Sequence, residues 1–211
     1  QRQMCIRDSM YMDKIAVGPR AKGCIDIDAP VSENLERVAK ALERKVSDLT
    51  VVLLDRERHY GIMDEIRRAG ARIQLITDGD VNPIVNAGIE GTGVHMYIGK
   101  GGAPEGVLAA AAIKCLGGDM QARLCPEDDE QVKRCLEMGI CDCQQVLSLD
   151  DMVKGDDCMF TATAITESNL LSGLRYFGGG VRTHTVSMRY KTGTVPVSYT
   201  HLRAHETRHD L

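Results

Sequence analysis

The chain has 211 residues, a formal net charge of -4 and eight cysteines. This length allows one sizeable or two small domains with a buried core, and the negative charge argues against a nucleic-acid binder, which would show a basic face. No apolar run is long enough to span a bilayer and no signal-peptide pattern follows Met4, so we expect a cytoplasmic protein without membrane partners and with reduced thiols.

The predicted elements begin with strand-like runs and an amphipathic helix. Residues 10–27 contain two apolar runs, interrupted at Gly18 and Gly23, that predict two short strands. A helix is predicted over 33–45, because apolar residues recur there at helical spacing and Ser32 is a suitable N-cap.

Strands and helices then alternate from residue 49 to residue 149. The predicted helices cover 60–69, 81–87, 104–116 and 128–138. Such alternation predicts an α/β fold with a mainly parallel sheet and flanking helices. Beyond residue 150, the segments 158–165 and 181–190 predict C-terminal antiparallel strands that pair with each other.

Three predicted buried strands run directly into polar or glycine-rich residues. The first, 51–54, leads into Asp-Arg-Glu-Arg-His, the second, 73–76, into Thr-Asp-Gly-Asp, and the third, 96–98, into a glycine-rich segment over 99–106. Ligands bind outside the carboxyl ends of the strands in an open α/β sheet, so we expect the three clusters to converge on one site.

The residue types in these clusters suit a phosphorylated polyol with a metal ion nearby. Arg56 and Arg58 lie two apart, so in an extended chain both guanidinium groups leave the same face and can fork onto phosphate oxygens. Asp78 and Asp80 suit sugar hydroxyls or a divalent cation. Bare backbone N–H groups in the glycine-rich segment can approach an anion, and Glu105 can reach a cation that bridges it.

Each cluster also has a purely structural interpretation. An Arg-x-Arg pair after a strand is commonly a solvated loop, and Asp-Gly-Asp is a common turn in which Asp80 would cap the helix that begins at Val81. The glycine-rich segment lacks the Lys-Ser or Lys-Thr pair of a Walker A motif. The shared placement of the three clusters favours the functional interpretation.

Six separated motifs strengthen the functional interpretation. They are Met-Tyr-Met-Asp-Lys (10–14), Val-Gly-Pro (17–19), Ala-Lys-Gly (21–23), Asp-Gly-Asp-Val (78–81), Gly-Gly-Ala-Pro-Glu-Gly-Val (101–107) and Phe-Thr-Ala-Thr-Ala-Ile-Thr (160–166). In this order and at this spacing, the chain resembles the class II fructose-1,6-bisphosphatases over residues 10–195. The resemblance implies part of the layered, inositol monophosphatase-like fold of sugar phosphatases.

The resemblance also implies a function and a set of site residues. It implies a hydrolase that removes the 1-phosphate of fructose 1,6-bisphosphate with manganese or magnesium, in gluconeogenesis, and that is a homo-oligomer when intact. The substrate-contacting positions would be Tyr11, Arg56, Glu57, Arg58, Asp78, Gly79, Asp80 and Gly102, and the metal ligand would be Glu105. The acidic cluster around Glu57 departs from the family pattern.

A larger departure is that the chain has no Gly-Glu-Gly-Glu or Asp-Pro-Ile-Glu-Gly-Thr type motif. In the family these motifs supply most metal carboxylates and the threonine that positions the attacking water, so no catalytic residue is assigned here. We therefore expect residues 10–195 to be the C-terminal portion of an enzyme, inactive alone, and the adapter-like segments 1–9 and 196–211 to be non-native.

Three alternatives stay open. The intact protein prefers sedoheptulose 1,7-bisphosphate, or it accepts both sugars, or the chain is a non-catalytic module that binds sugar phosphates. His59 follows Arg58, yet the resemblance gives it no catalytic role, and His95 is expected to pack or cap. The tail histidines 201, 205 and 209 and the cysteines at 125–143 are not expected to bind a metal.

Overall fold

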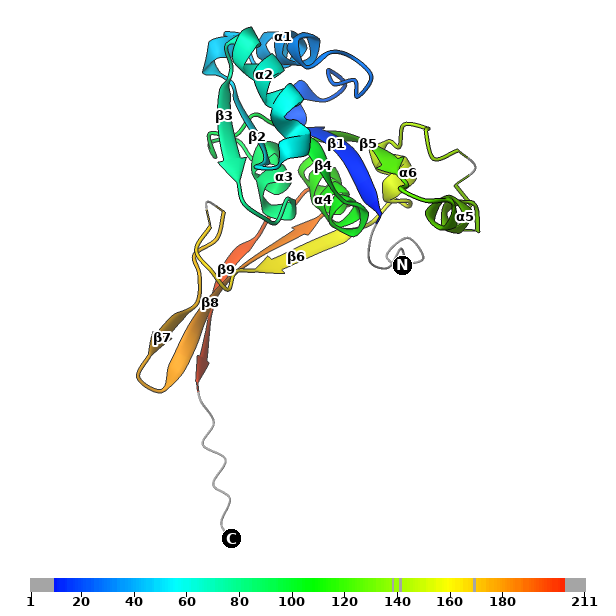
Figure 1. The fold of residues 1–211 in the computed structure, drawn as a ribbon. Helices are drawn as coiled ribbons and strands as arrows, with labels where there is room; N and C mark the ends of the chain where they lie inside the picture. The colour runs from blue at the N-terminus through cyan, green and yellow to red at the C-terminus, as the bar shows by residue number, and fades with distance from the viewer. Residues whose placement is uncertain (1–9, 138, 141, 169, 204–211) are drawn as a thin grey trace.

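The structure is a computed structural model that describes residues 10–203 except 138, 141 and 169. Its centre is a five-stranded sheet in the order β3-β2-β4-β1-β5 (Figure 1). The strands are β1 (Tyr11–Val17), β2 (Thr50–Leu54), β3 (Arg72–Ile76), β4 (Met96–Gly102) and β5 (Asp119–Cys125). The predicted non-native segment 1–9, Cys141 and the histidines at 205 and 209 lie outside the described residues.

The sheet is mixed, which corrects the prediction of a mainly parallel sheet. β2 pairs in parallel with β3 and β4, but β1 lies antiparallel between β4 and β5. An inner strand covered on both faces is apolar in either direction, so the residues of β1 did not reveal its orientation. The second strand expected within 10–27 is also wrong, because the chain after Gly18 forms the 3-10 helix η2 (Pro19–Ala21).

Two helices cover each face of this sheet (Figure 1). They are α1 (Val31–Ala41) and α2 (Tyr60–Ala69) on one face, and α3 (Val81–Gly88) and α4 (Ala103–Leu116) on the other. The successive alanines Ala109 and Ala110 of α4 are fully buried, so their small side chains let this helix pack close to its neighbours.

A second sheet packs against α3 and α4 on the side away from the first. Its strands are β6 (Met159–Thr163), β7 (Arg175–Phe177), β8 (Gly180–Arg189) and β9 (Val197–Arg203). β6 and β8 pair antiparallel, which confirms the predicted C-terminal pair, and Val186 and Met188 join Val85 and Cys115 in a shared core. β9 falls in the tail predicted to be non-native and pairs with β8, and the origin of that tail stays a prediction.

Short helical elements complete the fold. They are η3 (Val46–Asp48), η4 (Glu57–His59), α5 (Asp129–Glu137) and α6 (Leu149–Met152). In the described part of the chain, no helix has the length and apolar character required to cross a membrane.

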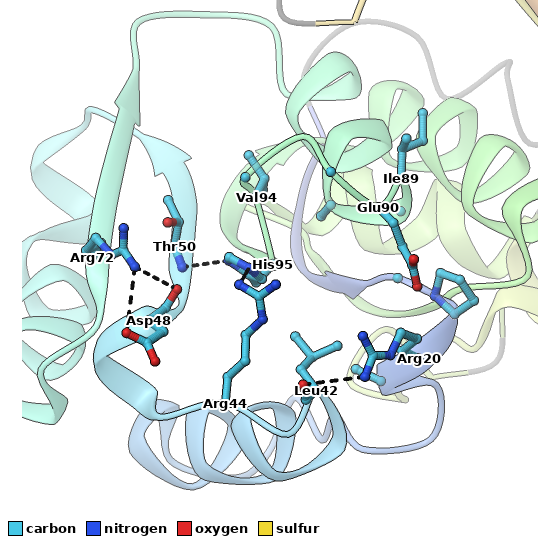
Figure 2. Close-up of a pocket in the computed structure, with 17 residues that line it drawn as sticks. Arg20, Leu42, Arg44, Asp48, Thr50, Arg72, Ile89, Glu90, Val94 and His95 are labelled. Atoms are coloured by element: carbon cyan, nitrogen blue, oxygen red, sulfur yellow. Dashed lines mark hydrogen bonds and ion pairs between the residues drawn. The ribbon is translucent and has the colours of Figure 1, made fainter.

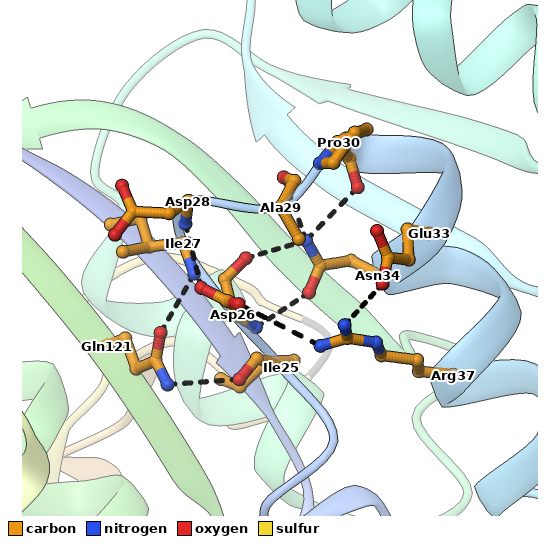
Figure 3. Close-up of polar contacts among 10 residues, drawn as sticks. All are labelled: Ile25, Asp26, Ile27, Asp28, Ala29, Pro30, Glu33, Asn34, Arg37 and Gln121. Atoms are coloured by element: carbon orange, nitrogen blue, oxygen red, sulfur yellow. Dashed lines mark hydrogen bonds and ion pairs between the residues drawn. The ribbon is translucent and has the colours of Figure 1, made fainter.

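The loop before α1 is fastened by a buried amide, as Figure 3 shows. The Nδ2 atom of Asn34 lies 2.8 Å from the carbonyl oxygen of Asp26, and its Oδ1 accepts the N–H of Asp26 at 2.8 Å. Gln121 of β5 binds the backbone of Ile27 and Ile25. These bonds fix where the helix begins, so it starts at Val31 and the predicted cap at Ser32 is wrong.

Candidate functional site

A buried ion pair lies where β1 and β4 meet α3. Lys14 of β1 is 1% exposed and Asp80, just before α3, is 3% exposed. The Lys14 ammonium pairs with the Asp80 carboxylate and also donates to the carbonyl oxygen of Gly102 at 2.9 Å. The Tyr97 hydroxyl donates to the same carboxylate at 3.3 Å. Burial lowers the pKa of Lys14 and the charge of Asp80 partly offsets this, while burial raises the pKa of Tyr97.

Glycines make room for this pair at the end of β4. A side chain at Gly101 would overlap the Asp80 carboxylate and would place its Cβ 2.9 Å from Lys14 Nζ. A Cβ at Gly106 would lie 3.1 Å from Lys14 Cδ. Glycine at positions 101 and 106 therefore leaves the space that the Lys14 side chain occupies, because a larger residue at either position would not fit.

Two cations flank the ring of Tyr11 near the same end of the sheet. The Arg58 guanidinium lies 5.0 Å from the ring centroid and the Lys100 ammonium 5.4 Å from it. Arg58 also donates through Nη2 to the carbonyl oxygen of Lys100 at 2.9 Å. Both distances are within the range of cation–π attraction, so the three side chains form one cluster that presents positive charge.

His59 fixes the position of Lys100 relative to the end of β2. Its Nδ1 lies 2.8 Å from the carbonyl oxygen of Leu54, at the end of β2, and its Nε2 lies 2.9 Å from the backbone nitrogen of Lys100. The backbone N–H must donate, so Nε2 is the acceptor and Nδ1 carries the proton. Burial lowers the pKa of His59, which favours this neutral form. With both nitrogens engaged, His59 is a positioning residue between β2 and β4.

The two arginines of the Arg-x-Arg sequence diverge. Arg56 donates from Nη2 to the carbonyl oxygen of Thr77 at 2.7 Å, whereas Arg58 points to Lys100. The expectation of a shared face is therefore wrong, because Glu57–His59 forms a 3-10 helix in which residues two apart do not point the same way. Glu57 is exposed at the start of that turn.

The Asp-Gly-Asp sequence separates into an exposed and a buried carboxylate. Asp78 is exposed and accepts the N–H of Gly79, which adopts a left-handed φ of 71°. Asp80 was predicted to cap α3 in the structural interpretation, but its side chain makes no capping hydrogen bond and pairs with Lys14 instead.

The glycine-rich segment is a strand end that leads into a helix. Residues up to Gly102 belong to β4, and the N–H of Ala103, the first residue of α4, already donates to the carbonyl oxygen of Met10 at 3.0 Å. The Glu105 carboxylate lies against Gly102, where a side chain would overlap it. Glu105 is exposed in the first turn of α4, where the helix dipole favours negative charge.

The described residues do not by themselves form a complete site for the expected divalent cation. No group of three or more histidine, cysteine, aspartate or glutamate side chains suited to a metal occurs among them. Asp80 is engaged by an ammonium group, and Glu105 alone offers too few oxygen ligands, since magnesium needs six and usually keeps several waters.

The clusters nevertheless meet at one end of the sheet. Arg58 donates to the carbonyl oxygen of Lys100 in β4, and the Glu105 carboxylate lies against Gly102 at the end of the same strand. Asp80 pairs with Lys14 of β1, and Lys14 donates to the carbonyl oxygen of Gly102. Arg58, Asp80 and Glu105 therefore surround the junction of β1 and β4, as expected from three strand ends.

Sequence reasoning missed several members of this arrangement: Lys14, Tyr97, Lys100 and the positioning role of His59. One signal was available for Lys14, which is a lysine within the otherwise mostly apolar run 10–17. A fully buried lysine needs a carboxylate partner.

An end of an α/β sheet that gathers guanidinium, ammonium and carboxylate groups is typical of proteins that bind small phosphorylated molecules. A family profile described as bacterial fructose-1,6-bisphosphatase, glpX-encoded, matches residues 1–201. The chain belongs to this family, the class II fructose-1,6-bisphosphatases.

Individual relatives agree with the family. The chain is 43% identical over 198 residues to a protein of Synechococcus sp. (strain JA-3-3Ab) named D-fructose 1,6-bisphosphatase class 2/sedoheptulose 1,7-bisphosphatase. It is 40% identical over 196 residues to a protein of Acaryochloris marina (strain MBIC 11017) with the same description and the number 2. These matches cover 88% and 87% of this chain but 57% and 56% of the relatives, so the chain spans little more than half their length.

Proposed function

We propose that this chain supplies the sugar-phosphate-binding part of an enzyme that hydrolyses the 1-phosphate of fructose 1,6-bisphosphate. The observation that carries the proposal is the convergence of Arg58, Asp80 and Glu105 at the junction of β1 and β4. Cations and hydroxyl-binding groups in one place match the two chemical parts of a sugar phosphate.

In this proposal the cation cluster binds the phosphate that is not cleaved. Arg58 and Lys100 both lie over the ring of Tyr11, so a phosphate beside the ring would accept hydrogen bonds from both cations. Arg56 stays a proposed substrate contact. Its Nη groups donate to the carbonyl oxygens of Asp55 and Thr77, so Arg56 also links the loops that follow β2 and β3. Glu57 and Gly79 stay proposed contacts on the family resemblance.

The sugar hydroxyls would meet the carboxylates and the strand end. Asp78 is exposed and able to accept from a hydroxyl, whereas Asp80 is held by Lys14 and would act as an oriented acceptor. The missing side chain at Gly102 leaves room for the carboxylate of Glu105, which we propose as one metal ligand. The other ligands would come from residues beyond those described, and the metal identity, manganese or magnesium, is part of the proposal.

The binding half of the proposal can be tested on the chain itself. Isothermal titration with fructose 1,6-bisphosphate should give saturable binding that Arg58→Gln weakens by about tenfold or more, because a charge-assisted hydrogen bond is lost. Arg68→Gln, an exposed arginine on α2, is the matched control and should bind as the unaltered chain does. Equal affinity of the Arg58 and Arg68 variants would remove the phosphate role from Arg58.

The catalytic half requires a longer protein. A chimera that places the N-terminal part of the Synechococcus relative before residue 10 should release phosphate from fructose 1,6-bisphosphate, whereas the present chain should release almost none. In the chimera, Glu105→Gln should lower turnover and shift the manganese requirement upward, and Glu33→Gln, an exposed control on α1, should change neither. Unchanged activity of the Glu105 variant across a manganese titration would remove Glu105 from the metal site.

A second substrate is favoured by the relatives, whose names pair fructose 1,6-bisphosphatase with sedoheptulose 1,7-bisphosphatase. We propose the same pair for the intact enzyme, and competition kinetics with both sugars on the chimera would rank them. The finer assignments also belong to the proposal: an inositol monophosphatase-like arrangement of layers, a homo-oligomer and a cytoplasmic enzyme.

A further inference from the structure

A separate cavity of about 400 Å³ opens at the other end of the central sheet. It lies where β2, β3 and β4 begin and where β1 ends, and its walls include Arg20, Arg44, Arg72 and His95 (Figure 2). The seven residues of β4 span about 20 Å between this end and the candidate substrate site. The cavity is therefore not part of that site.

The protonation of His95 is determined by its partner on β2. The backbone N–H of Thr50 points to His95 Nδ1 at 2.9 Å, and a backbone N–H only donates, so Nδ1 is the acceptor. Because Nδ1 accepts this bond it carries no proton, and burial, followed by the charges of Arg44 and Arg72, lowers the pKa of His95, which favours the neutral ring. The single ring proton must then sit on Nε2.

This tautomer leaves two donors facing each other. His95 Nε2 lies 3.2 Å from Nη1 of Arg44, and a guanidinium nitrogen has no acceptor capacity (Figure 2). The two N–H groups cannot satisfy each other, but one anion placed beside both would accept from each. The contact therefore marks a place where an anionic ligand removes a conflict that the protein alone leaves in place.

The charges around the cavity agree with an anion. Three arginines face two carboxylates, those of Asp48 and Glu90. Arg72 lies 4.0 Å from the Asp48 carboxylate, whereas Arg44 and Arg20 form no ion pair among the residues that the structure describes. Positive charge therefore remains near His95, whereas Asp48 offsets the charge of Arg72.

We propose that this cavity binds the phosphate group of a small phosphorylated metabolite, with Arg44 and the Nε2–H of His95 as the donors. The cavity is larger than a phosphate ion, and Leu42, Val94 and Ile89 also line it (Figure 2). The apolar wall suits the organic part of the ligand, and a volume of this size is typical of small-molecule sites. A tetrahedral phosphate also presents several oxygens to donors that arrive from different elements, which a planar carboxylate does less well.

The first test is made on the unaltered chain by nitrogen NMR of the histidine side chains. Without ligand, His95 should carry its proton on Nε2, and a proton on Nδ1 would overturn the proposal because the donor conflict would not exist. Addition of inorganic phosphate should shift the His95 ring signals and the amide signals of residues 91–95 in a saturable manner. A shift that rises without saturation, or an equal response to acetate, would refute a phosphate site.

Two variants separate this cavity from the candidate substrate site. Arg44→Gln should weaken the phosphate response of His95 by about tenfold or more, and its exposed position should leave the fold intact. Arg58→Gln should leave the His95 response unchanged, since Arg58 lies at the other end of the sheet. Loss of the His95 response in the Arg58 variant, with retention in the Arg44 variant, would show that phosphate acts from the other site and would overturn the proposal.

Discussion

Replacement of Lys14 by methionine should remove a large part of the free energy of unfolding. Methionine keeps the volume and the unbranched stem of lysine, so the main change is the loss of the ammonium group. Among the described residues, the Asp80 carboxylate, 3% exposed, would then keep only the Tyr97 hydroxyl at 3.3 Å as a donor. Removal of one partner from a buried pair costs about 3–5 kcal/mol, compared with about 5–15 kcal/mol for a typical domain.

A variant of Asp80 and the double variant measure the interaction energy between Lys14 and Asp80. Asp80→Asn should cost a similar amount, because the buried ammonium then faces neutral acceptors, the amide oxygen and the carbonyl oxygen of Gly102, in place of a counter-charge. The double variant of Lys14→Met and Asp80→Asn removes both charges and should lie within about 2 kcal/mol of the unaltered chain. The sum of the single costs should therefore exceed the cost of the double variant, which is the signature of direct coupling.

Urea unfolding followed by circular dichroism measures these values on the chain as it stands. Lys40→Met, an exposed lysine of α1, is the matched control and should change the free energy of unfolding by less than about 0.5 kcal/mol. If Lys14→Met costs less than about 1 kcal/mol, or if the two single costs simply add, Lys14 and Asp80 are not a buried pair in solution and the geometry of the candidate site is wrong.

Two further predictions concern stability. Asn34→Ala should lower the free energy of unfolding, measured in urea, by about 2–3 kcal/mol, because backbone groups of the loop before α1 lose their partners. The control Glu33→Ala, at an exposed position, should change it by about 0.5 kcal/mol or less. Equal effects of the two variants would contradict the role of Asn34. Burial lowers the pKa of His59, so the unfolded chain binds a proton at this residue as the pH falls through about 6.5 while the folded chain does not. The free energy of unfolding should therefore decrease below that pH, and it should decrease less in His59→Gln. Parallel pH profiles of the two proteins would exclude His59 as a source of the pH dependence.

Helices were predictable because their signals are local. α2 occupies the predicted 60–69, since Gly70 ends it with a left-handed φ of 86°. α4 begins one residue before its predicted start, with Pro104 in the first turn, where its missing N–H costs nothing. Periodicity and end signals lie within one segment of chain, so a single sequence contains them.

Features that depend on two distant segments were not predictable in the same way. Lys14 and Asp80 are 66 residues apart, and they meet because β1 inserts next to β4, an orientation that its buried residues do not encode. Asp80 in isolation looked like a helix cap, and the Arg-x-Arg pair looked extended until η4 turned Arg58 toward β4. In each case the local interpretation was reasonable and the tertiary contact decided the outcome.

The glycines at the end of β4 show how these two levels combine. They were expected to expose backbone N–H groups to an anion, but they lie in a paired strand, where their main effect is to leave space for side chains. That space is filled by His59 beside Gly99, by the Lys14 and Asp80 pair beside Gly101, and by Glu105 beside Gly102. Charged groups from three other elements can therefore reach one strand end because glycine occupies positions 99, 101 and 102 of this strand. In the proposed site, ligand recognition would therefore rely on side-chain charges held by packing, so their loss should affect stability and binding together.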